Sequence, residues 1–264
     1  MIELKNIHKY YNPGSVNELC LFQNFSLEIP DGDFVAVVGS NGSGKTSLLN
    51  IICGTIPIDS GDIVVNGTSI VEKKDFLRHR SIGRVYQDPS KGTCPSMTIL
   101  ENLSLADNKG KPYNLGKGIN KAKIEQYKEL LKKLNLGLED KLYTQVGSLS
   151  GGQRQALALL MSTMTPIEFL ILDEHTAALD PKTAAKVLAL TDKIITENHL
   201  TAMMVTHNMR DAIAHGNRLI MMNNGKVILN IAGEEKKKLT VEDLLQKFEE
   251  VSGEEFASDK ALLG

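Results

Sequence analysis

One segment constrains the fold of this 264-residue chain more than any other: a Gly-rich loop between a buried strand and a helix. The strand is predicted over residues 34–38, where a continuous apolar run is typical of a strand covered on both faces. The loop that follows, Gly39-Ser40-Asn41-Gly42-Ser43-Gly44-Lys45-Thr46, matches G-x-x-x-x-G-K-[ST]. A helix is expected from Lys45 to about Cys53. In such a loop, backbone N–H groups turn toward a phosphate, the lysine reaches the β- and γ-phosphates, and the threonine hydroxyl can bind Mg²⁺. The setting predicts a phosphate site; the alternative is a Gly/Ser-rich turn with a surface lysine.

Two adjacent carboxylates, Asp173 and Glu174, end a second apolar run over residues 169–172. Beside a phosphate-binding loop, the first acid can hold Mg²⁺ directly or through water, and the second can polarise a water molecule. The alternative is a strand end that simply meets solvent. Pairing with Lys45 favours the functional interpretation.

A second candidate phosphate site is Leu149-Ser150-Gly151-Gly152-Gln153, at the expected start of a long apolar helix. Glycine allows close backbone approach and Ser150 adds a hydroxyl donor at a helix N-terminus. Ser-Gly-Gly is also a common capping sequence, and these residues alone favour an ordinary capped helix.

The remaining pattern predicts an α/β fold. The first third holds short β-rich runs with a hairpin signal at Asn66-Gly67, and residues 88–165 are mostly helical. A strand at 169–172, a helix near 183–197 and a strand at 202–205 imply parallel pairing, followed by a hairpin through Asn224-Gly225. Near the end, Thr240 with Asp243 predicts a capped amphipathic helix that packs on the core.

Composition excludes several classes of protein. A hydrophobic fraction of 42% and a charged fraction of 23% are those of a globular protein with a sizeable core. A formal net charge of -2 gives no basic excess for nucleic acid, so no nucleic-acid partner is expected. The three cysteines have no zinc-ligand spacing and indicate a reducing compartment. The chain shows neither a secretory-signal layout nor an apolar stretch of about 20 residues, which a spanning helix needs.

With these motifs in this order, the sequence resembles the nucleotide-binding subunits of ABC transporters, up to about residue 232. Residues Leu149–Gln153 correspond to the signature motif, and Gln87 to the loop glutamine between the core and the helical subdomain. Asp180, in Ala177-Ala178-Leu179-Asp180, corresponds to the dimer-contact loop, and His207 to the switch histidine. By itself His207 could be a structural histidine at a strand end.

The resemblance implies a P-loop NTPase core with an antiparallel β subdomain and an inserted α-helical subdomain. The ABC ATPase domain would span 1–232, with core and β subdomain at 1–87 and 165–232 and helical subdomain at about 88–164. A C-terminal helical tail would follow at 233–264.

The resemblance also implies that two subunits pack head to tail and bury two ATP molecules. Each ATP would lie between the Lys45 loop, with Ser47, of one subunit and Ser150, Gly151, Gly152 and Gln153 of the other. Thr46, Gln87 and Asp173 would hold Mg²⁺, with Glu174 as general base and His207 on the γ-phosphate. Tyr11 would stack on adenine, although Tyr10 could serve instead and a packing role is open.

Three positions depart from the family pattern. His175 stands where proline commonly follows the catalytic glutamate, and Ala177 replaces the usual serine of the dimer-contact loop. The helix after the signature lacks its customary arginine over residues 156–163. None of these removes a group from the phosphate path, so the reaction type is expected to persist.

The function expected from the resemblance is that of an ATPase driving solute transport through a separate membrane permease, with import of a small solute such as an amino acid preferred. A second copy or a paralogue, permease subunits and an extracytoplasmic substrate-binding protein would be partners, at the cytoplasmic face of the cell membrane. The alternatives are an exporter ATPase and a soluble ABC-type ATPase of a cytosolic assembly machine, such as iron–sulfur cluster assembly.

Overall fold

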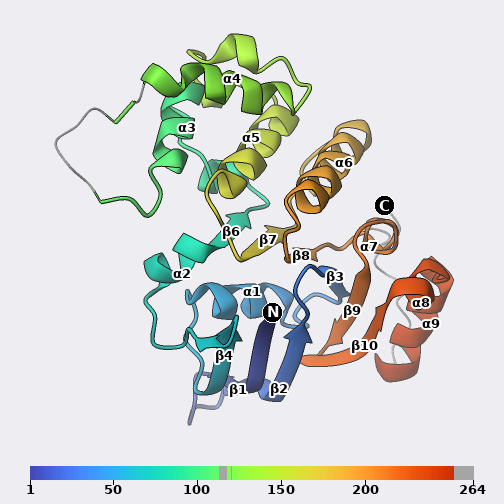
Figure 1. Cartoon of the computed structure of the whole chain (residues 1–264). Helices are drawn as coiled ribbons and strands as arrows, with labels where there is room; N and C mark the ends of the chain where they lie inside the picture. Colours follow the sequence, from blue (N-terminus) through green and yellow to red (C-terminus); the bar gives the residue numbers. More distant parts are fainter. Residues whose placement is uncertain (113–117, 120, 253–264) are drawn as a thin grey trace. The chain divides into compact units, whose positions relative to one another are not determined.

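The computed structural model describes residues 1–112, 118–119 and 121–252 (Figure 1). The chain forms two compact units. Unit 1 comprises Met1–His79 and Asn198–Gly264, and unit 2 comprises Arg80–Glu197.

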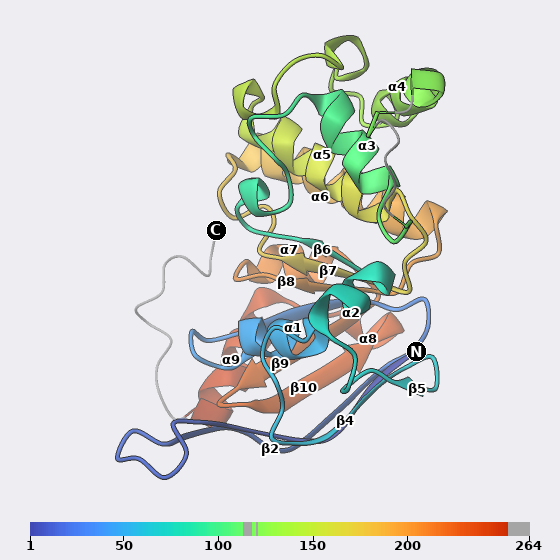
Figure 2. The same ribbon diagram turned by 90° about the vertical axis from the view of Figure 1, so that its left-hand side faces the viewer.

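An antiparallel sheet in unit 1 has the order β2-β1-β4-β5. Its strands β2, β4 and β5 can be followed in Figure 2. Its strands are β1 (Ile2–Tyr11), β2 (Leu19–Ile29), β4 (Ser60–Val65) and β5 (Thr68–Ser69). In β1 the buried positions are first Ile2 and Leu4 and then Ile7, because a bulge at Asn6, with φ of 50°, shifts the alternation. The hairpin predicted at Asn66-Gly67 joins β4 to β5 with φ of 48° and 76°, which confirms the turn.

The remaining strands of unit 1 pair mostly in parallel around β3 (Phe34–Gly39), in which every residue is buried. β3 lies between β8 (Ala202–Val205) and β9 (Arg218–Asn223), both parallel to it, and β10 (Lys226–Ala232) pairs antiparallel with β9. The unit also contains the helices α1 (Lys45–Cys53), α7 (Met209–Ala214), α8 (Gly233–Lys237) and α9 (Val241–Ser252). The apolar run at residues 34–38 therefore forms the doubly covered strand that its sequence predicts.

Unit 2 joins two parallel strands, β6 (Ile82–Val85) and β7 (Phe169–Asp173), to a group of helices. The helices are α3 (Ile99–Asp107), α4 (Ile124–Lys132), α5 (Gly151–Thr163) and α6 (Pro181–Glu197), and α2 (Asp75–Ser81) leads into the unit. Short 3-10 turns occupy Pro89–Lys91, Lys121–Lys123, Glu139–Lys141 and Val146–Ser148. A core of buried side chains such as Leu103, Tyr127, Leu131 and Leu157 holds α3, α4 and α5 together.

These elements confirm the predicted α/β class. Helix α1 and strand β8 occupy the ranges expected from the sequence. Helix α9 begins after Thr240, whose hydroxyl accepts from the Asp243 backbone at 3.2 Å, and its buried side chains include Leu244 and Phe248. The end of the predicted tail, residues 253–264, lies outside the described residues, and the predicted subdomain boundaries stay a prediction. Within the described ranges, no helix combines the length and apolarity needed to cross a bilayer.

Candidate functional site

The loop after β3 has a backbone that requires glycine at two positions. A Cβ on Gly39, where φ is 152°, would lie 2.1 Å from the Met222 carbonyl oxygen in β9. A Cβ on Gly44, where φ is 100°, would lie 3.1 Å from the ring of Phe22 in β2. Only glycine therefore fits at these two positions, which begin and end the loop. A loop of this kind can bring its backbone N–H groups close to a ligand.

Lys45, the first residue of α1, is 5% exposed, and its amine points back into the loop. Its Nζ donates to the carbonyl oxygens of Gly39 at 2.7 Å and Ser40 at 2.8 Å, and lies 3.5 Å from the hydroxyl of the buried Ser43. A bound phosphate could accept stronger, charge-assisted hydrogen bonds from this amine. Asn41, Gly42 and Thr46 are exposed, as a ligand-contacting loop requires.

Tyr11, the last residue of β1, lies beside the first turn of α1. Its hydroxyl donates to Ser47 Oγ at 3.5 Å, and the Lys9 amine lies 5.7 Å from its ring centroid. Tyr10 pairs with Cys20 across β1 and β2, and a side-chain hydrogen bond with Cys20 is the main cause of its raised pKa. Tyr11 is thus the tyrosine with a contact to the phosphate-loop helix.

His207 follows the carboxyl end of β8, at the same end of the sheet where the phosphate loop follows β3. β8 and β3 are parallel with Val205 opposite Val37, and the Thr206 backbone N–H donates to the Val37 carbonyl at 3.2 Å. Because carboxyl ends of parallel strands meet at one edge, His207 and Gly39 share that edge. Unit 1 therefore gathers the loop, Tyr11 and the predicted switch histidine around one end of α1 and β3.

In unit 2, Asp173 ends β7 and forms an ion pair with Arg84 that was not predicted from the sequence. Arg84 Nη2 in β6 donates to Asp173 Oδ2 at 2.7 Å, and the two side chains are 8% and 15% exposed. The Arg84 guanidinium also lies 4.6 Å from the Tyr86 ring centroid. Sequence reasoning missed Arg84, although a cation within the otherwise buried strand Ile82–Val85 was an available signal.

Gln87 lies just beyond β6 and is exposed. Val85 pairs with Leu172 in the parallel β6–β7 ladder, so Gln87 follows β6 at the same end of the sheet where Asp173 ends β7 and Glu174 follows it. The Tyr86 carbonyl before Gln87 accepts from Gln155 Nε2 of α5 at 2.9 Å. Unit 2 thus places the predicted metal ligands Gln87 and Asp173 and the predicted base at one strand edge.

Helix α5 begins with a reciprocal cap. Ser150 Oγ accepts from the Gln153 backbone N–H at 3.3 Å, and Gln153 Oε1 accepts from the Ser150 backbone N–H at 3.2 Å. Gln153 Nε2 also donates to the Leu136 carbonyl at 3.2 Å. The capping interpretation is thus confirmed, and the exposed Ser150 still lies at the positive end of a 13-residue helix.

Gly151 and Gly152 bring α5 close to the segment that contains Asp180. A Cβ on Gly152 would lie 2.2 Å from Thr183 Cγ2, and one on Gly151 would lie 3.2 Å from Leu179. Asp180 Oδ1 accepts from the Thr183 backbone N–H at 3.1 Å, and the hydrogen bonds from Thr183 lower the pKa of this carboxyl. The predicted signature and dimer-contact residues are therefore adjacent within unit 2.

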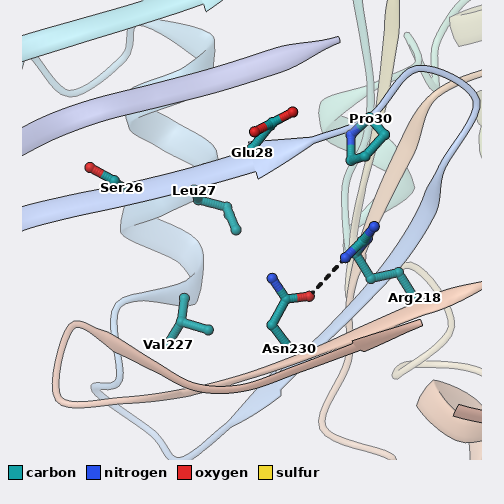
Figure 3. Close-up of a pocket in the computed structure, with 7 residues that line it drawn as sticks. All are labelled: Ser26, Leu27, Glu28, Pro30, Arg218, Val227 and Asn230. Carbon is teal, nitrogen blue, oxygen red and sulfur yellow. Dashed lines mark hydrogen bonds between the residues drawn. The ribbon is translucent and has the colours of Figure 1, made fainter. Parts of the chain in front are cut away.

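Each unit contains a cavity. One of about 680 Å³ in unit 2 borders three signature residues, and its lining is Lys133, Leu134, Asn135, Leu136, Ser150, Gly152, Gln153, Ala156, Thr183, Lys186, Val187, Ala189, Leu190 and Lys193. One of about 370 Å³ in unit 1 lies between β2, β9 and β10 (Figure 3). Arg218, which lines this cavity, donates hydrogen bonds from Nη1 to Asn230 Oδ1 at 3.1 Å and from Nε to Asp33 Oδ2 at 2.7 Å. None of the predicted site residues lines this second cavity.

Comparison with known families gives a match to the ABC transporter model over residues 22–177. The chain is 49% identical to a tyrosine transport ATP-binding protein of Clostridioides difficile, over 94% of this chain and 99% of that protein. It is 34% identical to the probable ABC transporter ATP-binding protein PEB1C of Campylobacter jejuni, over 86% of this chain and 89% of that protein.

Solved structures agree. The ATP-binding cassette MJ0796, in a dimeric post-hydrolysis state bound to ADP and Pi, matches with a TM-score of 0.73 and 30% identity, over 88% of this chain and 98% of that chain. The fold is therefore that of ABC ATPase cassettes, as the motifs imply. The family match, the relatives and the shared fold show that the chain belongs to the ABC transporter family as an ATP-binding subunit and is an ABC-type ATP hydrolase.

Proposed function

We propose that this chain binds MgATP between two copies arranged head to tail, and that hydrolysis drives import of a small solute through a separate permease. The observation that carries the proposal is the presence of two helix starts suited to phosphate. One is the Lys45 loop of unit 1, and the other is the Ser150-capped α5 of unit 2. A head-to-tail pair would use the first from one copy and the second from its partner.

The proposed metal ligands are the Thr46 hydroxyl, the Gln87 side-chain carbonyl and the Asp173 carboxylate. All three are oxygen donors, which suit Mg²⁺, so the residues fit the group. When bound, Mg²⁺ neutralises charge on the phosphates. Arg84 orients the Asp173 carboxylate through Oδ2.

Glu174 is the proposed general base. It takes a proton from the attacking water as the water oxygen bonds to the γ-phosphorus, and the bond to the β–γ bridging oxygen breaks to leave ADP and phosphate. Lys45 and His207 would hold the γ-phosphate oxygens, and Tyr11 would stack on adenine. Ser150 to Gln153 and Asp180 would complete the site across the dimer.

An amino acid is the proposed cargo class. Its support is the 49% identity to a protein named for tyrosine transport. Among more distant relatives, the chain is 32% identical to a macrolide export ATP-binding/permease protein that it covers over 34% of that protein's length, so export is the competing direction. The proposed partners are permease subunits, a second copy or a paralogue, and an extracytoplasmic substrate-binding protein reached through the permease. The chain would then lie at the cytoplasmic face of the membrane.

The test uses a strain of the native host that lacks this chain, complemented with the wild type or with Glu174→Gln. Import predicts that labelled tyrosine or another amino acid accumulates only with the wild type, and that a multispanning permease copurifies from detergent-solubilised membranes. Normal uptake with slowed efflux in the mutant strain would instead establish export. Copurification of soluble proteins alone, with the chain absent from membranes, would move the assignment to a cytosolic assembly ATPase.

A further inference from the structure

The backbone of Glu174 is in the left-handed region, with φ of 47°. Eight non-glycine residues of the described chain have positive φ, and the other seven are asparagine or histidine, which tolerate this region. Glutamate has no such preference, because its longer side chain does not hydrogen-bond its own backbone as asparagine does. Surrounding contacts must therefore hold Glu174 in this conformation.

Two contacts limit the backbone on either side of Glu174. Leu172 is fixed in the parallel ladder with Val85 of β6, and the Glu174 carbonyl accepts from the Ala177 backbone N–H at 3.0 Å. His175, which lies in the sequence between Leu172 and Ala177, is 2% exposed. A buried imidazole directly after the strained residue is placed to act as its side-chain anchor.

One hydrogen-bond partner of the His175 imidazole is Thr191 of α6, which is 0% exposed. His175 Nε2 lies 3.1 Å from Thr191 Oγ1, and Thr191 Oγ1 donates to the Val187 carbonyl at 2.8 Å. Because the Thr191 hydroxyl donates its one hydrogen to Val187, Oγ1 is left to accept from His175 in the tautomer that carries a proton on Nε2. The imidazole is thus a directed donor to a helix residue whose own hydroxyl is fixed.

We infer that His175 is a positioning residue for hydrolysis: its hydrogen bond to Thr191 ties the peptide after Glu174 to α6, which keeps Glu174 left-handed and fixes the direction of its carboxylate. This inference rests on the proposed role of Glu174 as general base. It adds a residue that does not touch the nucleotide.

The test is Thr191→Val in the full-length chain, which keeps the side-chain shape and removes the acceptor. Because a small misplacement of the base slows the chemical step, we expect kcat to fall roughly 10-fold or more while KM for ATP stays within about twofold. Thr191→Ser restores an acceptor and should recover most of kcat. Thr163→Val in α5 is the matched control, since the Thr163 hydroxyl also bonds a helix carbonyl, Leu159 at 3.1 Å, in a different part of unit 2.

A double variant separates positioning from stability. Thr191→Val removes one hydrogen bond of the buried His175 and should lower Tm, whereas replacing both partners in His175→Leu/Thr191→Val can restore Tm. A positioning role predicts that kcat stays low in the double variant even where Tm recovers. Recovery of kcat together with Tm would overturn the inference.

Parallel measurement of Glu174→Gln distinguishes the two possible failures. An inactive Glu174→Gln with a wild-type kcat in Thr191→Val would refute the inference alone. A Glu174→Gln variant that hydrolyses ATP like the wild type would refute the proposed base, and the inference with it.

Discussion

At the scale of single residues, Glu174→Gln separates catalysis from binding. The amide cannot accept the proton of water, so steady-state hydrolysis should fall by roughly 10²–10⁴-fold while ATP binding persists. Phosphate release and size-exclusion chromatography with ATP would measure both effects, and an ATP-bound dimer should accumulate. The control is Glu129→Gln, at an exposed ion pair with Lys132. Near wild-type turnover in Glu174→Gln would reject the assignment of the base.

Lys45→Ala should act earlier, on nucleotide affinity. The Lys45 amine lies within the loop, 2.7 Å from the Gly39 carbonyl oxygen. When ATP is bound, its positive charge is expected to contact the phosphates. Its loss should weaken ATP binding at least about tenfold by equilibrium titration, which corresponds to about 1.4 kcal/mol. Lys128→Ala, at an exposed pair with Glu125, is the matched control. An unchanged dissociation constant for Lys45→Ala would argue against the phosphate cradle.

Arg84 makes a prediction about stability. Arg84→Met leaves the Asp173 carboxylate, 15% exposed, without its cation, and should lower the free energy of unfolding by up to about 3 kcal/mol. Lys132→Met breaks a pair whose side chains are 55% and 66% exposed, and should leave the free energy of unfolding almost unchanged. Urea unfolding of both variants makes the comparison, and equal midpoints would show that the Arg84 pair adds no stability.

The residues of the site differ in how far sequence alone could identify them. The phosphate loop and the two acids are contiguous motifs, so their spacing is visible directly. Arg84 was missed because its partner lies 89 positions away on another strand, and only the β6–β7 pairing reveals it. The contact of His175 with Thr191 is hidden for the same reason, since it needs the packing of α6.

At the scale of elements, turns and buried strands were predictable and exposed strand ends were not. The Asn-Gly turns and the apolar β3 carry local signals. By contrast, β1 continues to Tyr11 and β2 begins at Leu19, where polar and exposed residues and register shifts interrupt the alternation. There the backbone N–H and C=O groups are hydrogen-bonded to a neighbouring strand, and the sequence of a single strand does not reveal that pairing.

The close approach of α5 and α6 can be tested through Gly152. Alanine ordinarily favours a helix, but here its Cβ would lie 2.2 Å from Thr183 Cγ2, so Gly152→Ala should destabilise by about 1–3 kcal/mol through overpacking. Adding Thr183→Ala removes that methyl group and should restore most of the loss in thermal unfolding. Gly151→Ala, whose nearest contact is a flexible leucine methyl at 3.2 Å, should have the smaller effect. A double variant no more stable than Gly152→Ala would show that the methyl clash is not the cause.

At the scale of the whole molecule, the two helix starts proposed to bind phosphate belong to different units, and patterns within the sequence do not explain this division. Lys45 belongs to unit 1 and Ser150 to unit 2, about a hundred positions apart in sequence. Either one alone has an ordinary interpretation, a glycine turn or a capped helix. Only the family resemblance links them, because it supplies a second copy of the chain, which no pattern within one chain can show.

Mixed dimers test that arrangement. Lys45→Ala removes the cradle, and Ser150→Phe places a bulky ring at the start of α5, so neither variant alone should hydrolyse ATP. In a head-to-tail heterodimer, the intact Lys45 loop of the Ser150→Phe copy faces the intact signature of the Lys45→Ala copy, which restores one of two sites. With random assortment half of the dimers are mixed, so an equal mixture should regain about a quarter of the wild-type rate.

Phosphate release from the mixture, compared with each variant alone at the same total concentration, makes this measurement. Both variants must first show wild-type Tm, since Ser150→Phe also removes the helix cap. If each chain completed its site from its own Lys45 loop and its own signature, every chain in the mixture would carry one defect. The rate would then stay at that of the separate variants, and the head-to-tail arrangement would be rejected.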